Sequence, residues 1–142
     1  MVIKLKNPPI IEAVIDIDCD FKVALDLKSI ETQVRKQLAK SYPKLKPVVV
    51  QDHRFEQNQY SMKSGLAAFQ FLKNDEKQLV QFRTEGFSFN RLAPYTTLDD
   101  YLPHVKKNWE IYRKFAQPSQ VKSIRLRYIN RVLLPLSRNM DL

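Results

Sequence analysis

Residues 11–21 carry an apolar side chain at every second position, and this stretch constrains the fold more than any other. One face of the alternation carries Ile11, Ala13, Ile15, Ile17, Cys19 and Phe21, and the other carries Glu12, Val14, Asp16, Asp18 and Asp20. A period of two is typical of a strand with one buried face and one face in water. The chain must therefore build a sheet whose first strand has an acidic outer face.

The remaining periodicities predict two helices and four further strands. Apolar residues at steps of three and four predict helices from Asp26 to Pro43 and from Thr97 to Pro118. Strands are predicted over residues 48–55, 66–72, 79–92 and 121–134, with a turn region over 58–65. In the strand 79–92 the apolar phase shifts across Gly86, which indicates a β-bulge. Phe87 and Phe89 are predicted to lie in the core.

The predicted order is βαβββαβ in a single α+β domain spanning residues 1–142. Strands with one wet face and two amphipathic helices favour an antiparallel or mixed sheet with both helices on one face. We therefore expect a ferredoxin-like two-layer sandwich. In the last strand the apolar side chains should point inward and the basic ones outward; the inward set is Ile124, Leu126, Tyr128, Val132 and Leu134, and the outward set is Ser123, Arg125, Arg127 and Arg131.

The chain is strongly basic, with 24 Lys and Arg residues against 15 Asp and Glu residues and a net charge of +9. Between Lys106 and Arg131 there are eight basic residues and one acid, Glu110. Such a distribution can attract nucleic acid, an acidic partner or a small anion. Two glycines exclude most glycine-rich phosphate loops, and two histidines with one cysteine disfavour a metal cluster. The absence of a secretory signal, of an apolar span and of a second cysteine predicts a soluble cytoplasmic protein.

Three segments together resemble a sporadically distributed family of uncharacterised bacterial and archaeal proteins. They are NPPIIEAVIDI from Asn7, GFSFNRLAPY from Gly86 and LRYINRVLLP from Leu126. The resemblance covers nearly the whole chain and implies a bacterial-type cytosolic protein, with no activity, cofactor or catalytic residue to carry over. Members of that family are usually longer and have a second α+β half. The resemblance therefore implies that this chain corresponds to the N-terminal half of such a protein or is a short member of the family.

The acidic residues Asp16, Asp18 and Asp20 share one strand face at a spacing of about 6.5–7 Å. Paired carboxylates can hold Mg²⁺ or Ca²⁺ or act as acid and base, which makes these residues a candidate metal site. The favoured alternative is that they form cross-strand ion pairs with the arginines of the last strand. We therefore predict no metal site, no cofactor and no catalytic residue.

The best candidates for ligand binding are the arginines and asparagines of the later strands. Arginine can contact a carboxylate or phosphate with two parallel hydrogen bonds, which lysine cannot do. The candidate ligand patch consists of Asn90, Arg91, Arg125, Arg127, Asn130 and Arg131. Alternatively, each arginine pairs with the acidic first strand or caps a loop carbonyl, and that second interpretation is favoured.

The sequence therefore predicts a non-enzymatic binding or interaction module, expected to be a homodimer and to meet a protein or small anionic ligand through its polar sheet face. An alternative is nucleic-acid binding through the basic segment from Lys106 to Arg131. The run from Glu85 to Asn90 partly resembles an RNA-binding strand, although Glu85 stands where that motif has a basic residue. A third alternative is a metal-dependent hydrolase that uses Asp16, Asp18 and Asp20.

Overall fold

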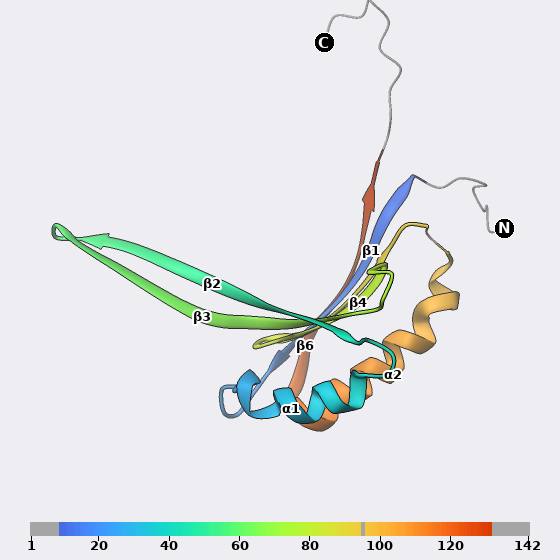
Figure 1. Cartoon of the computed structure of the whole chain (residues 1–142), viewed down its shortest axis with the longest axis horizontal. Coiled ribbons are helices and arrows are strands. Elements are labelled where there is room, and N and C mark those ends of the chain that lie inside the picture. The colour runs from blue at the N-terminus through green and yellow to red at the C-terminus, as the bar shows by residue number, and fades with distance from the viewer. Residues whose placement is uncertain (1–8, 95, 132–142) are drawn as a thin grey trace, which may run out of the picture.

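The computed structural model describes residues 9–94 and 96–131, which form one six-stranded antiparallel sheet with two helices on one of its faces (Figure 1). The elements are β1 (Ile10–Asp20), α1 (Leu27–Leu38), β2 (Lys44–Glu56), β3 (Gln59–Leu72), β4 (Gln78–Arg83), β5 (Gly86–Leu92), α2 (Leu98–Ala116) and β6 (Gln120–Asn130). The prediction of an α+β fold is confirmed, and the sheet is antiparallel rather than mixed.

The strand order β2-β3-β4-β5-β1-β6 places the first and last strands side by side. In the pairing of β1 with β6, Asp16 lies opposite Arg125 and Asp18 lies opposite Ser123. The acidic face of the first strand therefore adjoins the basic face of the last, as the charge pattern favours. β6 is one edge of the sheet and β2 is the other.

The predicted strand over 79–92 was wrong, because the structure has two strands there. β4 ends at Arg83 and β5 begins at Gly86, and these two residues lie opposite each other across a turn formed by Thr84 and Glu85. The shift in apolar phase comes from this turn and not from a β-bulge. The element order is therefore βαββββαβ.

Gly86 is required by the close approach of β1 to β5. A Cβ at this position would lie 2.1 Å from the carbonyl oxygen of Ile17. Gly86 is paired with Asp18 of β1 as well as with Arg83 of β4. Because no side chain fits at that distance, only glycine at this position lets β1 and β5 approach so closely.

The hydrophobic core lies between the helices and the sheet and is largely aromatic. Phe71, Phe82, Phe87 and Phe89 from the strands are almost fully buried against the helices. Tyr112 of α2 meets Phe82 edge to face with ring centroids 5.1 Å apart. The helical stripes and the two core phenylalanines of β5 are thus confirmed.

Both helices begin with side-chain caps. Asp26 accepts a hydrogen bond from the amide of Lys28 at 3.1 Å, and Thr97 and Asp100 form a capping box. The second helix starts at Leu98 and continues through Pro103, which we expected to limit its start. Pro103 is the sixth residue of the helix, and because it has no N–H the backbone hydrogen bond to the carbonyl of Asp99 is missing.

The β2–β3 hairpin extends far beyond the rest of the sheet (Figure 1). β3 pairs with β4 only over Ala68–Leu72, so residues 49–66 form a two-stranded arm that projects from the molecule. Gln57 and Asn58 make its turn with φ angles of 48° and 62°. The predicted turn region over 58–65 was wrong, because most of it is strand paired with β2.

The inward phase of β6 is confirmed by its register with β1, but its inward side chains are not buried. Ile124 is 68% exposed and Leu126 is 44% exposed, because neither helix extends over this strand. Val132 and Leu134, which were predicted to point inward, lie outside the described residues.

Among the described helices, none combines the length and apolar character that crossing a membrane requires.

Candidate interaction surface

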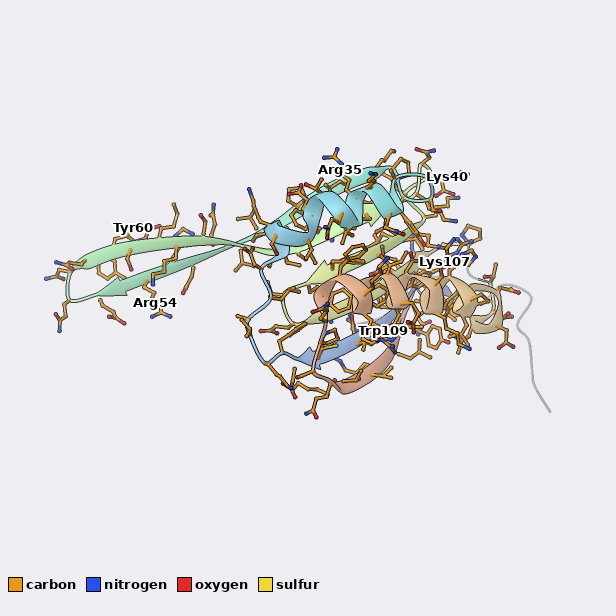
Figure 2. The ribbon with its side chains drawn as sticks, turned by 90° about the horizontal axis from the view of Figure 1, so that it is seen from below. Arg35, Lys40, Arg54, Tyr60, Lys107 and Trp109 are labelled. Atoms are coloured by element: carbon orange, nitrogen blue, oxygen red, sulfur yellow. The ribbon has the colours of Figure 1, made fainter. Side chains whose placement is uncertain are left out.

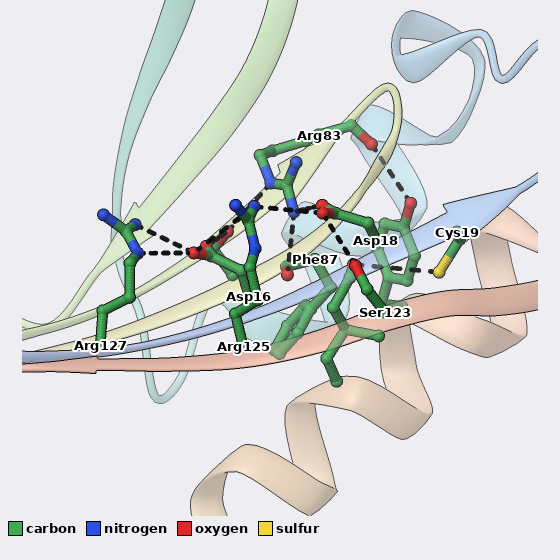
Figure 3. Close-up of polar contacts among 11 residues, drawn as sticks. Asp16, Asp18, Cys19, Arg83, Phe87, Ser123, Arg125 and Arg127 are labelled. Carbon is green, nitrogen blue, oxygen red and sulfur yellow. Dashed lines mark hydrogen bonds and ion pairs between the residues drawn. The ribbon is translucent and has the colours of Figure 1, made fainter.

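The polar face of the sheet carries a network of ion pairs between β1 and β6, here called the seam (Figure 3). Its members are Asp16, Asp18, Arg83, Ser88, Arg125 and Arg127. Arg127 Nη2 lies 2.9 Å from Asp16 Oδ2, and Arg125 Nη2 lies 3.1 Å from Asp18 Oδ2. Each carboxylate of the seam thus faces a guanidinium from the neighbouring strand.

Arg83 and Ser88 fix the two carboxylates from the other side. Arg83 donates through Nη2 to Asp18 Oδ1 at 2.8 Å and through Nε to Ser88 Oγ at 2.9 Å. Ser88 donates in turn to Asp16 Oδ1 at 2.6 Å. The side chain of Asp16 is only 7% exposed, so its carboxylate oxygens are bound by these partners rather than by water. The hydrogen bond from Arg83 is the main reason that the pKa of Asp18 lies below its ordinary value.

A second polar row crosses the same face over four strands. Gln70 donates to Gln81 at 3.3 Å, and Gln81 donates to Asn90 at 3.0 Å. Asn90 then donates to Glu12 at 2.7 Å. All amides of this row point toward the Glu12 carboxylate, so the row uses its polar groups internally rather than presenting them to a ligand.

The structure does not gather the six residues of the predicted ligand patch on one surface. Asn90 is buried in the polar row, and Arg125 and Arg127 belong to the seam. Arg91 lies on the opposite, helix-covered face, because it follows Phe89 at a spacing of two. Asn130 ends β6, and the amide of Arg131 donates to the carbonyl of Pro9 at 2.8 Å.

Arg91 instead belongs to a buried polar group below α2. It donates to Gln78 at 3.0 Å, and Gln78 donates to the hydroxyl of Tyr42 at 2.6 Å. Asn108 of α2 donates to the same hydroxyl at 3.0 Å. His104 lies near this group. Burial lowers the pKa of its imidazole, and the positive charge of Lys73 lowers it further. The group links β4, β5 and α2 with the segment between α1 and β2, which is a structural role.

The acidic residues proposed as the alternative metal site are directed at arginine and lysine side chains. Asp16 and Asp18 form the seam, and Asp20 lies 3.8 Å from the Nζ of Lys122. Over residues 9–94 and 96–131, no group of three or more metal-binding side chains converges. Cys19 is buried, and burial raises the pKa of its thiol, which lowers its reactivity.

An apolar groove of about 360 Å³ lies between α2 and β6, and sequence reasoning did not predict it. It is lined by Ile15, Ile17, Leu98, Leu102, Val105, Lys106, Trp109, Val121, Ile124 and Leu126. All but Lys106 are apolar. The signal in the sequence was the apolar phase of β6, which we assigned to the core because the periodicity cannot say which strand a helix covers.

β6 also has an outer edge that no described strand pairs with. Its polar face holds Arg125 and Arg127, whose side chains are 58% and 55% exposed, and its apolar face borders the groove. An exposed strand edge presents unpaired backbone amides and carbonyls. The edge, the groove and the two arginines form one continuous surface, here called the β6 surface.

Comparison with known proteins found no family model, no curated protein and no solved structure that matches this chain.

Proposed function

We propose that the protein is a non-enzymatic interaction module that binds a segment of another polypeptide as an added strand along β6. The observation that carries this proposal is the exposure of an eleven-residue edge strand whose apolar side borders a groove. Ile124, 68% exposed beside that groove, is its most accessible apolar side chain. Strand addition to a sheet edge is a common mode of peptide recognition, in which backbone hydrogen bonds supply affinity and alternate side chains supply specificity.

The chemistry of the β6 surface defines the partner. On one face of the sheet, the added strand meets the arginines Arg125 and Arg127. On the other face it meets the apolar groove. The matching segment therefore alternates carboxylate and apolar side chains, with the carboxylates on the arginine side.

β1 is an example of such a segment within the molecule. It lies along the inner edge of β6 with Asp16 and Asp18 beside the arginines and with Ile15 and Ile17 on the apolar face. Each guanidinium has five N–H donors and uses only part of them in the seam. The half-exposed arginines retain donors for carboxylates arriving from the outer edge.

Pairing of β6 with the β6 of a second copy is disfavoured by charge. An antiparallel two-fold pairing that is centred on residues 125–127 and keeps both apolar faces on one side sets these arginines opposite those of the other copy. Like charges directly across a strand pair are destabilising. The β6 surface therefore favours an acidic partner over itself.

A peptide with the sequence of residues 10–20, with serine in place of Cys19, tests this proposal. Trp109 is the only tryptophan of the chain and lines the groove, so its fluorescence reports binding there. We expect a saturable change that weakens with salt and is lost in Ile124→Asp. Val23→Asp is the matched control, because Val23 is 82% exposed and lies in the loop between β1 and α1.

The same peptide with lysine in place of its aspartates should not bind. Equal binding of the two peptides, or no response of Trp109 to the acidic peptide at low salt, would contradict the proposal. Protection of the β6 amides from hydrogen exchange distinguishes strand addition from displacement of β1, because displacement would expose the β1 amides.

Nucleic-acid binding through the basic segment has less support. Lys106, Lys107, Arg113 and Lys114 are exposed on α2, on the helix side of the sheet, whereas Arg125 and Arg127 face the opposite side and are paired with aspartates. A phosphate backbone requires cations along one track. A small anionic ligand is likewise less supported than an acidic strand.

Two further expectations stay proposals. The first is membership of the uncharacterised family that the three sequence segments resemble, with its cytosolic location. The second is ferredoxin-like topology: if the β2–β3 hairpin is treated as an insertion, the other elements follow the order β1-α1-β4-β5-α2-β6, which is the βαββαβ order of that fold.

A further inference from the structure

The β2–β3 arm is amphipathic, and its apolar face is exposed. The register sets Val49 opposite Leu66, His53 opposite Met62 and Phe55 opposite Tyr60. All of these side chains share one face because opposite residues of an antiparallel pair point the same way. The other face pairs Asp52 with Lys63 and Arg54 with Ser61. Figure 2 shows the arm extending away from both helices.

The exposures on the apolar face are high for such large side chains. Phe55 is 73% exposed, Tyr60 61%, and Met62 and Val49 55% each. The face continues the helix-covered side of the sheet, where Leu66 still packs against the core, but neither helix reaches past that point. An isolated two-stranded ribbon is at best marginally stable in water. The arm therefore needs a surface to cover this face.

We propose that the apolar face of the arm packs against the same face of the arm of a second copy, which makes the protein a homodimer. Charge favours this occupant. The arm contains two acids, Asp52 and Glu56, and two bases, Arg54 and Lys63, so it is neutral within a chain of net charge +9. Two copies repel each other least where they meet through this neutral segment.

The area of the arm is sufficient for a dimer. Phe55 and Tyr60 bury about 150–250 Å² each when fully covered, and they are 73% and 61% exposed before contact. With Val49, His53 and Met62 added, the side chains of two copies together remove on the order of 1,000 Å² from water. A specific interface begins at about 1,000 Å². His53 and Tyr60 share a hydrogen bond, so these two polar side chains have a partner within the arm when the face is covered. Gln51 and Ser64, which lie opposite each other between Val49 and His53, are the other polar residues of this face.

This dimer is independent of the proposed function, because the arm extends from the β2 edge and the peptide site lies at the β6 edge, the opposite end of the sheet. The two surfaces can therefore be tested separately. A wild-type protein that binds the peptide but stays monomeric would overturn only the present inference.

Val49 and Val50 provide a matched pair of variants. They are adjacent, 55% and 54% exposed, and lie on opposite faces of the arm. We expect Val49→Asp to raise the dimer dissociation constant by about tenfold or more, and Val50→Asp to leave it within about twofold. Sedimentation equilibrium and light scattering measure both against the wild type, whose monomer mass is 16.8 kDa.

Phe55→Asp extends the test to the tip, where it should also produce monomers, and Glu56→Gln on the other face is its control. Near-ultraviolet circular dichroism of the core aromatics confirms that each variant is folded. A monomeric wild type at hundreds of micromolar overturns the proposal. So does a dimer that Val49→Asp and Phe55→Asp leave intact, or one that Val50→Asp weakens equally. Binding of the monomeric arm to lipid vesicles would likewise overturn it and assign the face to a membrane surface.

Discussion

The two faces of β6 differ in whether their side chains have partners within the chain. On the polar side, the arginines of β6 meet carboxylates of β1 at 2.9 and 3.1 Å, and Asp16 is almost completely buried among its partners. On the apolar side, Ile124 and Leu126 border a groove that neither helix fills. One strand thus carries a surface whose charges are matched within the chain and a surface that lacks a cover.

The difference shows where binding capacity remains. Charged side chains that already have intramolecular partners gain little free energy from binding another molecule. A seam of this kind therefore mainly stabilises the sheet and sets the β1–β6 register. When another chain covers exposed apolar side chains beside a strand edge, the free energy falls by about 25 cal/mol per Å² of apolar surface buried. The apolar side of β6 is therefore the side on which association is favourable.

The most severe way to break the seam is to separate β5 from β1. Gly86→Ala places a Cβ 2.1 Å from the carbonyl of Ile17, and neither backbone can yield without losing pairing. We expect a loss of more than about 3 kcal/mol in the free energy of unfolding, or failure to fold. Gly65→Ala is the control, since nothing lies within 4 Å of its Cβ position. Urea denaturation that finds the two variants equally stable would contradict the close approach.

Removal of a buried carboxylate should have the next largest effect. Asp16→Ala leaves the hydroxyl of Ser88 and the guanidinium of Arg127 without their acceptor. We expect a loss of about 1–3 kcal/mol in the free energy of unfolding, measured by urea denaturation. Asp20→Ala, whose nearest cation is 3.8 Å away at an exposed position, should cost less than about 0.5 kcal/mol. If Asp20→Ala lost more unfolding free energy than Asp16→Ala, burial of the carboxylate would not determine how much it stabilises the protein.

Acid should weaken the polar side of β6 and leave the apolar side unchanged. The pKa of Asp18 is lowered in the folded protein, chiefly by the hydrogen bond from Arg83. The unfolded chain therefore binds a proton more readily, and the stabilisation present above about pH 4 is lost as the pH falls through the folded pKa. The stability difference between the wild type and Asp18→Asn should shrink with acidification. A difference that stays constant down to about pH 2.5 would refute this linkage.

The smallest effect on stability is expected on the apolar side. Ile124→Ser removes an apolar side chain that is already 68% exposed, so the free energy of unfolding should change by less than about 0.5 kcal/mol. The same variant should lose binding of the acidic peptide. The contrast with Asp16→Ala, measured by the same urea denaturation, sharpens the comparison. A large loss of stability in Ile124→Ser would mean that the groove is part of the core.

Much of the fold could be predicted from the sequence because local periodicity records which side of an element is buried. The alternation in β1, the helical stripes from Leu27 and Leu102, and the caps at Asp26 and Thr97 all correspond to observed elements. The pairing of the acidic and basic strands was predicted as the favoured interpretation of their charges, and the seam confirms it.

The errors arose where a pattern had two structural explanations. The phase shift at Gly86 fits a bulge or a tight turn, and only the pairing of Arg83 with Gly86 distinguishes them. Polar residues over 58–65 are typical of a turn, yet Tyr60 and Met62 already alternated as in a strand. The predicted ligand patch treated Asn90 and Arg91 as neighbours, although adjacent strand residues point to opposite faces.

The sequence by itself determined which side of each strand and helix is apolar, because hydrophobic periodicity is a local property of the chain. The tertiary structure alone decided which apolar sides are covered. Two helices are too few to cover a six-stranded sheet with a long hairpin, so the apolar sides of β6 and of the arm are left at the surface. Coverage depends on how the elements are placed in space, which a single strand's sequence does not encode.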